Sequence, residues 1–189
     1  MGPRQRLITT ATRLLTEQGV EAVTLRGIAK AAGVSHGAPL RHFTGRAELL
    51  SAVAALGFVE LRERETLLPA GTPRQRLIAA CHSYLDFALA NPAMFELMFR
   101  RDLIDPEEPE LITQSSAVFD LFAELVGDLQ TDLKDPGWHP GTDARLLAAS
   151  LWASLHGLAQ LWLWGGLAGA SFASSPEMAL AVTLDAYLG

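Results

Sequence analysis

The sequence predicts an all-α protein, on the strength of three observations. Apolar residues recur at helical spacing along most of the chain, and hydrophobic residues make up 49% of its composition with few β-branched runs. Proline and glycine divide the chain into segments of helical length. With 189 residues, the chain is long enough to bury a substantial core.

Basic residues are concentrated near the N-terminus. The whole chain has a net charge of −6, but residues 1–50 hold seven Arg and Lys residues against three Glu residues, a net charge of +4. The remainder holds eight basic against 18 acidic residues, a net charge of −10. Only the N-terminal part is suited to a polyanionic partner, so we expect one domain over residues 1–50 and a second over residues 51–189.

The N-terminal fifty residues predict three helices. The first runs from about Arg4 to Gln18, before a stop at Gly19, and its apolar stripe comprises Leu7, Ile8, Ala11, Leu14 and Leu15. Arg4 and Arg6 precede that stripe, and either contact a nearby phosphate or minor groove or form a frayed terminus.

Two short helices are then expected around a tight glycine turn. Thr24 is an N-cap and Gly33 ends the helix that follows, whose apolar face comprises Leu25, Ile28, Ala29 and Ala32. Ser35 caps a second helix that reaches about Phe43, with a first turn that Pro39 tightens or bends. This order predicts a helix-turn-helix.

The outward residues of the second helix are His36, Gly37, Arg41 and His42. Gly37 permits close backbone approach to a groove, Arg41 reaches a phosphate or a base edge, and His42 donates to phosphate. On spacing alone, a two-helix corner with a solvated basic face remains the alternative.

These residues resemble the TetR/AcrR-like transcriptional regulators. The matching pattern comprises Gly19, Thr24-Leu25, Ile28-Ala29, Ala32-Gly33-Val34-Ser35, Gly37, His42-Phe43 and Arg46-Ala47-Glu48-Leu49-Leu50. The family usually has Lys where Arg46 stands and Tyr, which contacts a phosphate, where Leu40 stands. Arg46 keeps the charge, whereas Leu40 cannot donate a hydrogen bond.

The resemblance implies a homodimer that binds double-stranded DNA, with two recognition helices in successive major grooves about 34 Å apart. Phosphate contacts are then expected from Thr24, Ser35, His42 and Arg46. His36, Gly37 and Arg41 would approach base edges, and Arg26 is a further candidate.

Downstream, Arg46 begins a longer helix that Pro69 ends, and its charged string 61–68 is expected on a solvated face. Further helices are expected from Pro73 to about Ala90, after Asn91-Pro92, from Leu111 to Leu129, and after Ser175, with a strong break at 135–141.

No charged residue occurs between Arg145 and Glu177, which raises the question of a transmembrane helix. Polar residues at membrane depth (Ser150, Ser154, His156 and Gln160) and the interruption at Gly165-Gly166 argue against a membrane. A four-helix homodimer interface explains the uncharged run instead, and burial of these helices within a monomer is the plain alternative.

Residues 84–99 and the stretch Leu151–Gly157 resemble one class of TetR-like ligand domains with a Trp-His-Gly signature. The candidate walls of a cavity for a small apolar or amphipathic effector are Phe87, Met94, Met98, Phe119, Phe122, Trp152 and His156. Each is alternatively an ordinary core residue, and His156 is alternatively satisfied by a neighbouring carbonyl or hydroxyl.

The sequence contains no catalytic or metal-binding motif: GxSxG, HExxH, CxxC and a phosphate-binding glycine loop are all missing, and its five His residues lack metal-ligand spacing. We therefore expect no enzyme, cofactor or metal. The lone Cys81 and the absence of an apolar leader predict a cytoplasmic protein.

The resulting hypothesis is a dimeric, ligand-responsive repressor that an effector releases from a palindromic operator. The competing hypothesis is an acidic helical protein that binds small molecules and whose basic corner is incidental.

Overall fold

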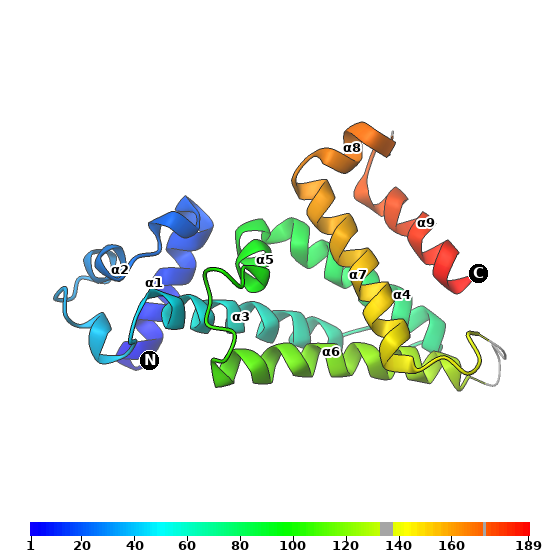
Figure 1. The fold of residues 1–189 in the computed structure, drawn as a ribbon, viewed down its shortest axis with the longest axis horizontal. Helices are drawn as coiled ribbons and strands as arrows, with labels where there is room; N and C mark the ends of the chain where they lie inside the picture. The colour runs from blue at the N-terminus through cyan, green and yellow to red at the C-terminus, as the bar shows by residue number, and fades with distance from the viewer. Residues whose placement is uncertain (133–137, 172) are drawn as a thin grey trace. The chain divides into compact units, whose positions relative to one another are not determined.

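The computed structural model describes residues 1–132, 138–171 and 173–189, and within these ranges every regular element is helical (Figure 1). The all-α prediction is confirmed. The chain forms two compact units. Unit 1 comprises residues 1–60 and 91–116, and unit 2 comprises residues 61–90 and 117–189. Unit 1 thus contains more than the domain predicted over residues 1–50, because residues 51–60 and 91–116 pack with it.

Unit 1 is built around the apolar stripe of its first helix. Its elements are α1 (Pro3–Gln18), the 3-10 helix η1 (Val20–Ala22), α2 (Leu25–Ala31), the 3-10 helix η2 (Pro39–Arg41), α5 (Pro92–Phe99) and the first parts of α3 (Arg46–Thr66) and α6 (Pro109–Gln130). The buried residues of α1 are the five predicted from the periodicity, and α1 packs against both α2 and α5. This packing holds the helix-turn-helix on a rigid support.

The helices α3 and α5 approach each other closely at Gly57. A Cβ atom at this position would lie 2.5 Å from Met98 Sδ and 2.9 Å from Met94 Cγ, so a larger residue would force the two methionine side chains to move. Phe99 adds edge-to-face contacts, with ring centroids 5.8 Å from Phe58 and 5.4 Å from Phe95. Met94 and Met98 therefore belong to the core of unit 1.

Unit 2 contains the end of α3, α4 (Pro73–Ala90), the rest of α6, α7 (Ala144–Leu163), α8 (Gly166–Ser171) and α9 (Pro176–Leu188). α7 packs against α4 and lies beside α9 (Figure 1). Local capping fixes the helix ends: the Gln75 N–H donates to Thr72 Oγ1 and the Thr72 N–H donates to Gln75 Oε1, a capping box that begins α4. The described part of the break predicted at 135–141, residues 138–141, is not helical, and residues 135–137 lie outside the described residues.

By length and composition alone, α7 is apolar enough to cross a membrane. Core helices of water-soluble proteins have the same properties. Leu151, Leu155 and Ala159 of α7 are buried, and α7 packs against α4 and α9. One face of α7 is thus a core face of unit 2, and Gly165, at a φ of 77°, ends the helix where the sequence predicts an interruption.

The end of α3 differs from the prediction of a solvated charged face. Glu65 is half-buried one turn after the buried Leu61, and its Oε2 atom is inaccessible and has no hydrogen-bond partner among the described residues. Burial disfavours the ionised carboxylate and raises the pKa of Glu65 to about 8. The charged string was misleading at this position, because Glu65 lies four residues after Leu61 and therefore on the same, inward side of the helix.

This buried carboxyl group predicts a specific pH dependence of stability. Because the pKa of Glu65 rises from 4.5 to about 8 on folding, the folded state holds a proton that the unfolded state has lost between these pH values. The free energy of unfolding should therefore fall as the pH rises through this window. Urea unfolding between pH 5 and pH 9 measures this change. The free energy of unfolding should fall less with pH in Glu65→Gln than in the wild type. Glu63 is exposed, so Glu63→Gln should show the same fall in the free energy of unfolding as the wild type. Identical profiles for Glu65→Gln and the wild type would contradict this assignment.

Candidate nucleic-acid interface

The turn after α2 is fixed by backbone chemistry. Thr24 Oγ1 accepts a hydrogen bond from the Gly27 N–H at 3.0 Å, which confirms the predicted N-cap. At the other end, Gly33 has a φ of 66°, and its N–H donates to Lys30 O while the Val34 N–H donates to Ala29 O. This pair of bonds is a Schellman motif, in which glycine takes the left-handed conformation at the lowest cost. The direction in which the chain leaves α2 is therefore set locally.

The segment after this turn corrects the prediction of a regular helix from Ser35 to Phe43. Residues 36–37 form a turn, and only Pro39–Arg41 are helical, as the 3-10 helix η2. Pro39 has no N–H to donate to Ser35 O, and that carbonyl instead accepts from the Ala38 N–H at 2.9 Å. The distortion extends beyond the first turn that was predicted: the N–H groups of Arg41 and His42 also form i to i+3 bonds, to Ala38 O and Pro39 O.

Six of the eight predicted DNA-contacting residues are exposed. We call them the polar face: Thr24, Arg26, Ser35, His36, Gly37 and Arg41. On the inner side of the same segment, Ile28, Pro39 and Phe43 are buried. The apolar side of the corner thus anchors it to unit 1, and the polar face is open to solvent.

The two remaining predicted residues, His42 and Arg46, are half-buried. Arg46 Nε donates to Val23 O at 2.8 Å, and its Nη2 donates to Val20 O at 2.7 Å and lies 3.8 Å from a carboxylate oxygen of Glu21. The Arg46 guanidinium thus joins the start of α3 to η1, the segment that leads into α2. Two of its five N–H donors are used in this way, so Arg46 has a structural role that the sequence did not indicate.

Leu40 is 61% exposed beside the polar face, where it cannot donate a hydrogen bond. Arg4 lies over the ring of the buried Phe43, with its guanidinium carbon 5.1 Å from the ring centroid. Glu48 accepts from both the N–H and the hydroxyl of Thr44, and these bonds hold the pKa of Glu48 below its usual value. The sequence reasoning missed these contacts at the start of α3, because Thr44 and Glu48 are four residues apart and the usual capping box has a spacing of three.

Comparisons with known proteins agree with this geometry. A family model described as bacterial regulatory proteins of the tetR family matches residues 7–53, across the helix-turn-helix. A second, described as the tetracyclin repressor-like C-terminal domain, matches residues 77–187, which is more than half of the chain. The chain belongs to the TetR family of bacterial regulatory proteins.

Individual TetR-family relatives match over different lengths. The transcriptional activator FasR of Mycolicibacterium smegmatis is 29% identical over 162 residues, which cover 85% of this chain and 72% of FasR. The regulator SrpR of Pseudomonas putida is 48% identical over 52 residues, which cover 28% of this chain and 24% of SrpR.

Among solved structures, a protein of unknown function from Rhodococcus sp. RHA1 is 29% identical, with a TM-score of 0.80 over 100% of this chain and 97% of its own. The fatty acid degradation regulator FadR from Bacillus halodurans has the same fold, with a TM-score of 0.74 at 15% identity, over 100% of this chain and 96% of FadR.

TetR-family proteins are transcription regulators rather than enzymes, and they bind DNA and small-molecule ligands, usually as dimers. This protein is accordingly a DNA-binding transcription regulator with an N-terminal helix-turn-helix and a C-terminal helical domain. Among the described residues, no group of three or more His, Cys, Asp or Glu side chains is arranged to hold a metal ion.

The seven predicted effector-binding residues of this TetR-family chain fall in both units. Met94 and Met98 lie in unit 1, whereas unit 2 contains Phe87, Phe119, Phe122, Trp152 and His156. The rings of Phe119 and Trp152 meet edge to face with centroids 6.3 Å apart, and Trp152 also lies beside His156, at 5.9 Å. The structure therefore brings Phe119, Trp152 and His156 together and places the two methionines in the other unit, while Phe87 and Phe122 are buried core residues of unit 2.

Tyr84 links these residues through polar contacts. Trp152 Nε1 donates to Tyr84 Oη at 3.1 Å, and Tyr84 Oη lies 2.9 Å from His156 Nδ1. Burial lowers the pKa of His156 and raises the pKa of Tyr84, so both side chains are neutral at pH 7. The neutral imidazole thus pairs with a hydroxyl, as the alternative for His156 anticipated. Sequence reasoning included Tyr84 only in the stretch 84–99 and gave it no role of its own.

The geometry of Arg46 predicts a loss of stability on its removal. Arg46→Ala should lower the free energy of unfolding by about 1 kcal/mol or more, because two carbonyl groups lose a charged hydrogen-bond donor. Arg26→Ala removes the same charge from the exposed polar face and should change stability by less than about 0.5 kcal/mol. Urea unfolding of both variants measures the difference. Equal stability of the two would mean that the Arg46 contacts contribute nothing to folding.

Proposed function

We propose that this protein is a homodimeric, ligand-responsive repressor that binds a palindromic operator through the polar face. The observation that carries the proposal is the separation of the two sides of the helix-turn-helix. Apolar residues are buried in unit 1, while His36, Gly37 and Arg41 are exposed together on a module with a net charge of +4. A cationic, exposed face is suited to phosphates and base edges in a major groove.

Individual residues then have distinct roles in this proposal. Thr24 keeps its hydroxyl hydrogen while its oxygen caps α2, and together with Ser35, His42 and the remaining Arg46 donors it would contact phosphates and fix the register. Arg41 and His36 would approach base edges, with Arg26 as a further candidate. Gly37 would let the backbone approach the groove.

A dimer is supported by exposed apolar side chains on two neighbouring helices of unit 2. They are Leu146 and Leu161 of α7, Trp164 at its C-cap, and Met178 and Val182 of α9. Exposed apolar side chains on two helices that pack together suit an interaction site, and two helices from each of two copies would form a four-helix interface. Burial of these side chains against a second copy also accounts for the uncharged sequence.

An effector site is supported by the contacts among Phe119, Trp152, His156 and Tyr84 in unit 2. Aromatic walls with a few fixed polar groups suit a small apolar or amphipathic molecule. An effector with a higher affinity for a conformer that cannot bind the operator would shift the population away from DNA. Nearly complete release requires a differential affinity of about 5.5 kcal/mol.

We place the protein in the cytoplasm, where the buried free thiol of Cys81 stays reduced.

Substitution of Gly37 tests the role of the polar face. A Cβ at this position would meet no atom within 4 Å, and its φ lies outside the left-handed region, so Gly37→Val should fold normally. The added side chain would keep the backbone from the groove, and affinity for DNA fragments selected from the source genome should fall at least about tenfold. Ala70→Val, at an exposed position of unit 2, is the matched control and should bind as the wild type does.

Fluorescence anisotropy measures the affinity, and sedimentation measures the dimer. Wild-type affinity in Gly37→Val would contradict the assigned face, and loss of the dimer in that variant would show that the corner is structural.

The sign of regulation is tested by a reporter gene behind the selected operator. Repression predicts low reporter output with the wild-type protein and high output with Gly37→Val, because the variant no longer occupies the operator. The opposite order would make the protein an activator, the description carried by FasR.

A further inference from the structure

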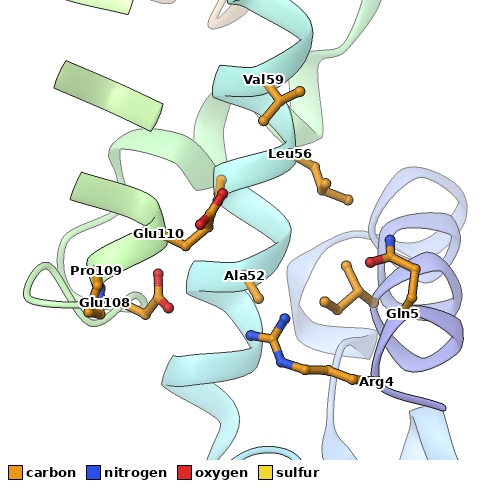
Figure 2. Close-up of a pocket in the computed structure, with 10 residues that line it drawn as sticks. Arg4, Gln5, Ala52, Leu56, Val59, Glu108, Pro109 and Glu110 are labelled. Carbon is orange, nitrogen blue, oxygen red and sulfur yellow. The ribbon is translucent and has the colours of Figure 1, made fainter. Parts of the chain in front are cut away.

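A groove in unit 1 has the properties of a second small-molecule site. Its volume is about 420 Å³, within the range of ligand pockets, and it lies between α1, α3 and the start of α6 (Figure 2). Apolar side chains supply its floor: Ile8 of α1 and Ala52, Ala55, Leu56 and Val59 of α3. Leu56 and Val59 are only half-buried, so the groove offers them to an occupant.

The walls of the groove carry opposite charges. Arg4 and Gln5 of α1 line one wall, and Glu108 and Glu110, at the start of α6, line the other. Figure 2 shows the Arg4 side chain extending from α1 towards α3, with the two glutamates across α3 from it.

These charged groups are positioned by their own contacts. The guanidinium of Arg4 is held over the Phe43 ring. Glu108 Oε2 accepts from the Leu111 N–H at 2.7 Å, and Glu110 Oε1 accepts from Gln114 Nε2 at 2.8 Å. Each carboxylate has a second oxygen and further lone pairs with which to meet a cation. The groove thus has a cationic wall, an apolar floor and an anionic wall, all within unit 1.

We propose that this groove binds a small zwitterion whose ammonium and carboxylate groups are separated by an apolar segment, as in a dipeptide of apolar residues. The carboxylate pairs with Arg4, the ammonium pairs with Glu108 and Glu110, and the apolar side chains cover Leu56 and Val59. Charge complementarity selects this class, because an anion would be attracted only to Arg4 and a cation only to the two glutamates, whereas a zwitterion is attracted to both walls of the groove. This site is distinct from the effector site proposed for unit 2, and it does not depend on DNA binding.

Leucyl-leucine and two charge-deleted analogues test the proposal on the full-length wild-type protein. The C-terminal amide lacks the carboxylate, and the N-acetyl form lacks the ammonium group. Leucyl-leucine should bind at least about fivefold more tightly than either analogue. Titration followed by amide chemical shifts should perturb Gln5, Ala52, Leu56 and Val59, which line or border the groove.

Two variants assign each end of the ligand. Arg4→Gln should remove the preference for leucyl-leucine over the amide and keep the preference over the N-acetyl form. Glu110→Gln should do the reverse. The matched controls are Arg6→Gln on α1 and Glu124→Gln on α6, which are exposed, remove the same charges and do not line the groove. Both should keep both preferences.

Three results would overturn the proposal: no binding of leucyl-leucine at millimolar concentration, equal binding of the three peptides, or shifts confined to amides away from the groove. Circular dichroism checks that each variant folds. If one does not, the binding of the three peptides to the wild type and the chemical-shift changes still test the proposal. Loss of operator binding leaves this test unchanged, so the two proposals fail independently.

Discussion

The left-handed turn at Gly33 is the constraint on which the DNA-binding half of the molecule depends. Its two backbone hydrogen bonds fix the exit direction of the chain, while Thr24 fixes the entry to α2. Pro39 and Phe43 then bury their side chains in unit 1, and the residues between them and the turn are left outward. The polar face exists because the apolar side of a short, irregular segment is anchored at both ends.

A second constraint acts from a distance in the sequence. Arg46 at the start of α3 donates to the carbonyl groups of Val20 and Val23, so α3 holds the segment that precedes α2. Glu48 satisfies the Thr44 N–H and hydroxyl at the same helix start. In this structure both residues stabilise the fold that presents the polar face, and Arg46 does so at a position where the family usually has Lys. The positive charge of Arg46, which suits DNA, therefore also stabilises the fold of residues 1–50.

Features with local causes could be predicted from the sequence. The stripe of α1, the Thr24 cap, the Gly33 turn and the starts of α4 and α5 at Thr72-Pro73 and Asn91-Pro92 follow from periodicity and capping chemistry. The form of the recognition segment could be predicted only in part. Pro39 indicated a distorted first turn, but the loss of the remaining α-helical bonds depends on how the segment packs.

Features with tertiary causes could not be predicted. Three such features depend on elements that are distant in the sequence. They are the burial of Glu65, the hydrogen bonds from Arg46 to carbonyl groups, and the link from Tyr84 to Trp152 and His156. Charge and amphipathic period describe each helix alone, and they do not show which neighbour a side chain meets. The separation of Met94 and Met98 from the other predicted effector residues has the same origin, since Gly57 admits them into unit 1.

The central claim is that a cationic head binds duplex DNA while the acidic remainder of the chain serves other contacts. The most direct measurement is the affinity for a labelled operator duplex at several salt concentrations. Release of counterions from phosphates predicts a steep, linear fall of log affinity with log salt, on the order of a thousandfold between 50 and 200 mM. Weak binding that stays constant across this range would contradict the claim and favour an acidic small-molecule binding protein.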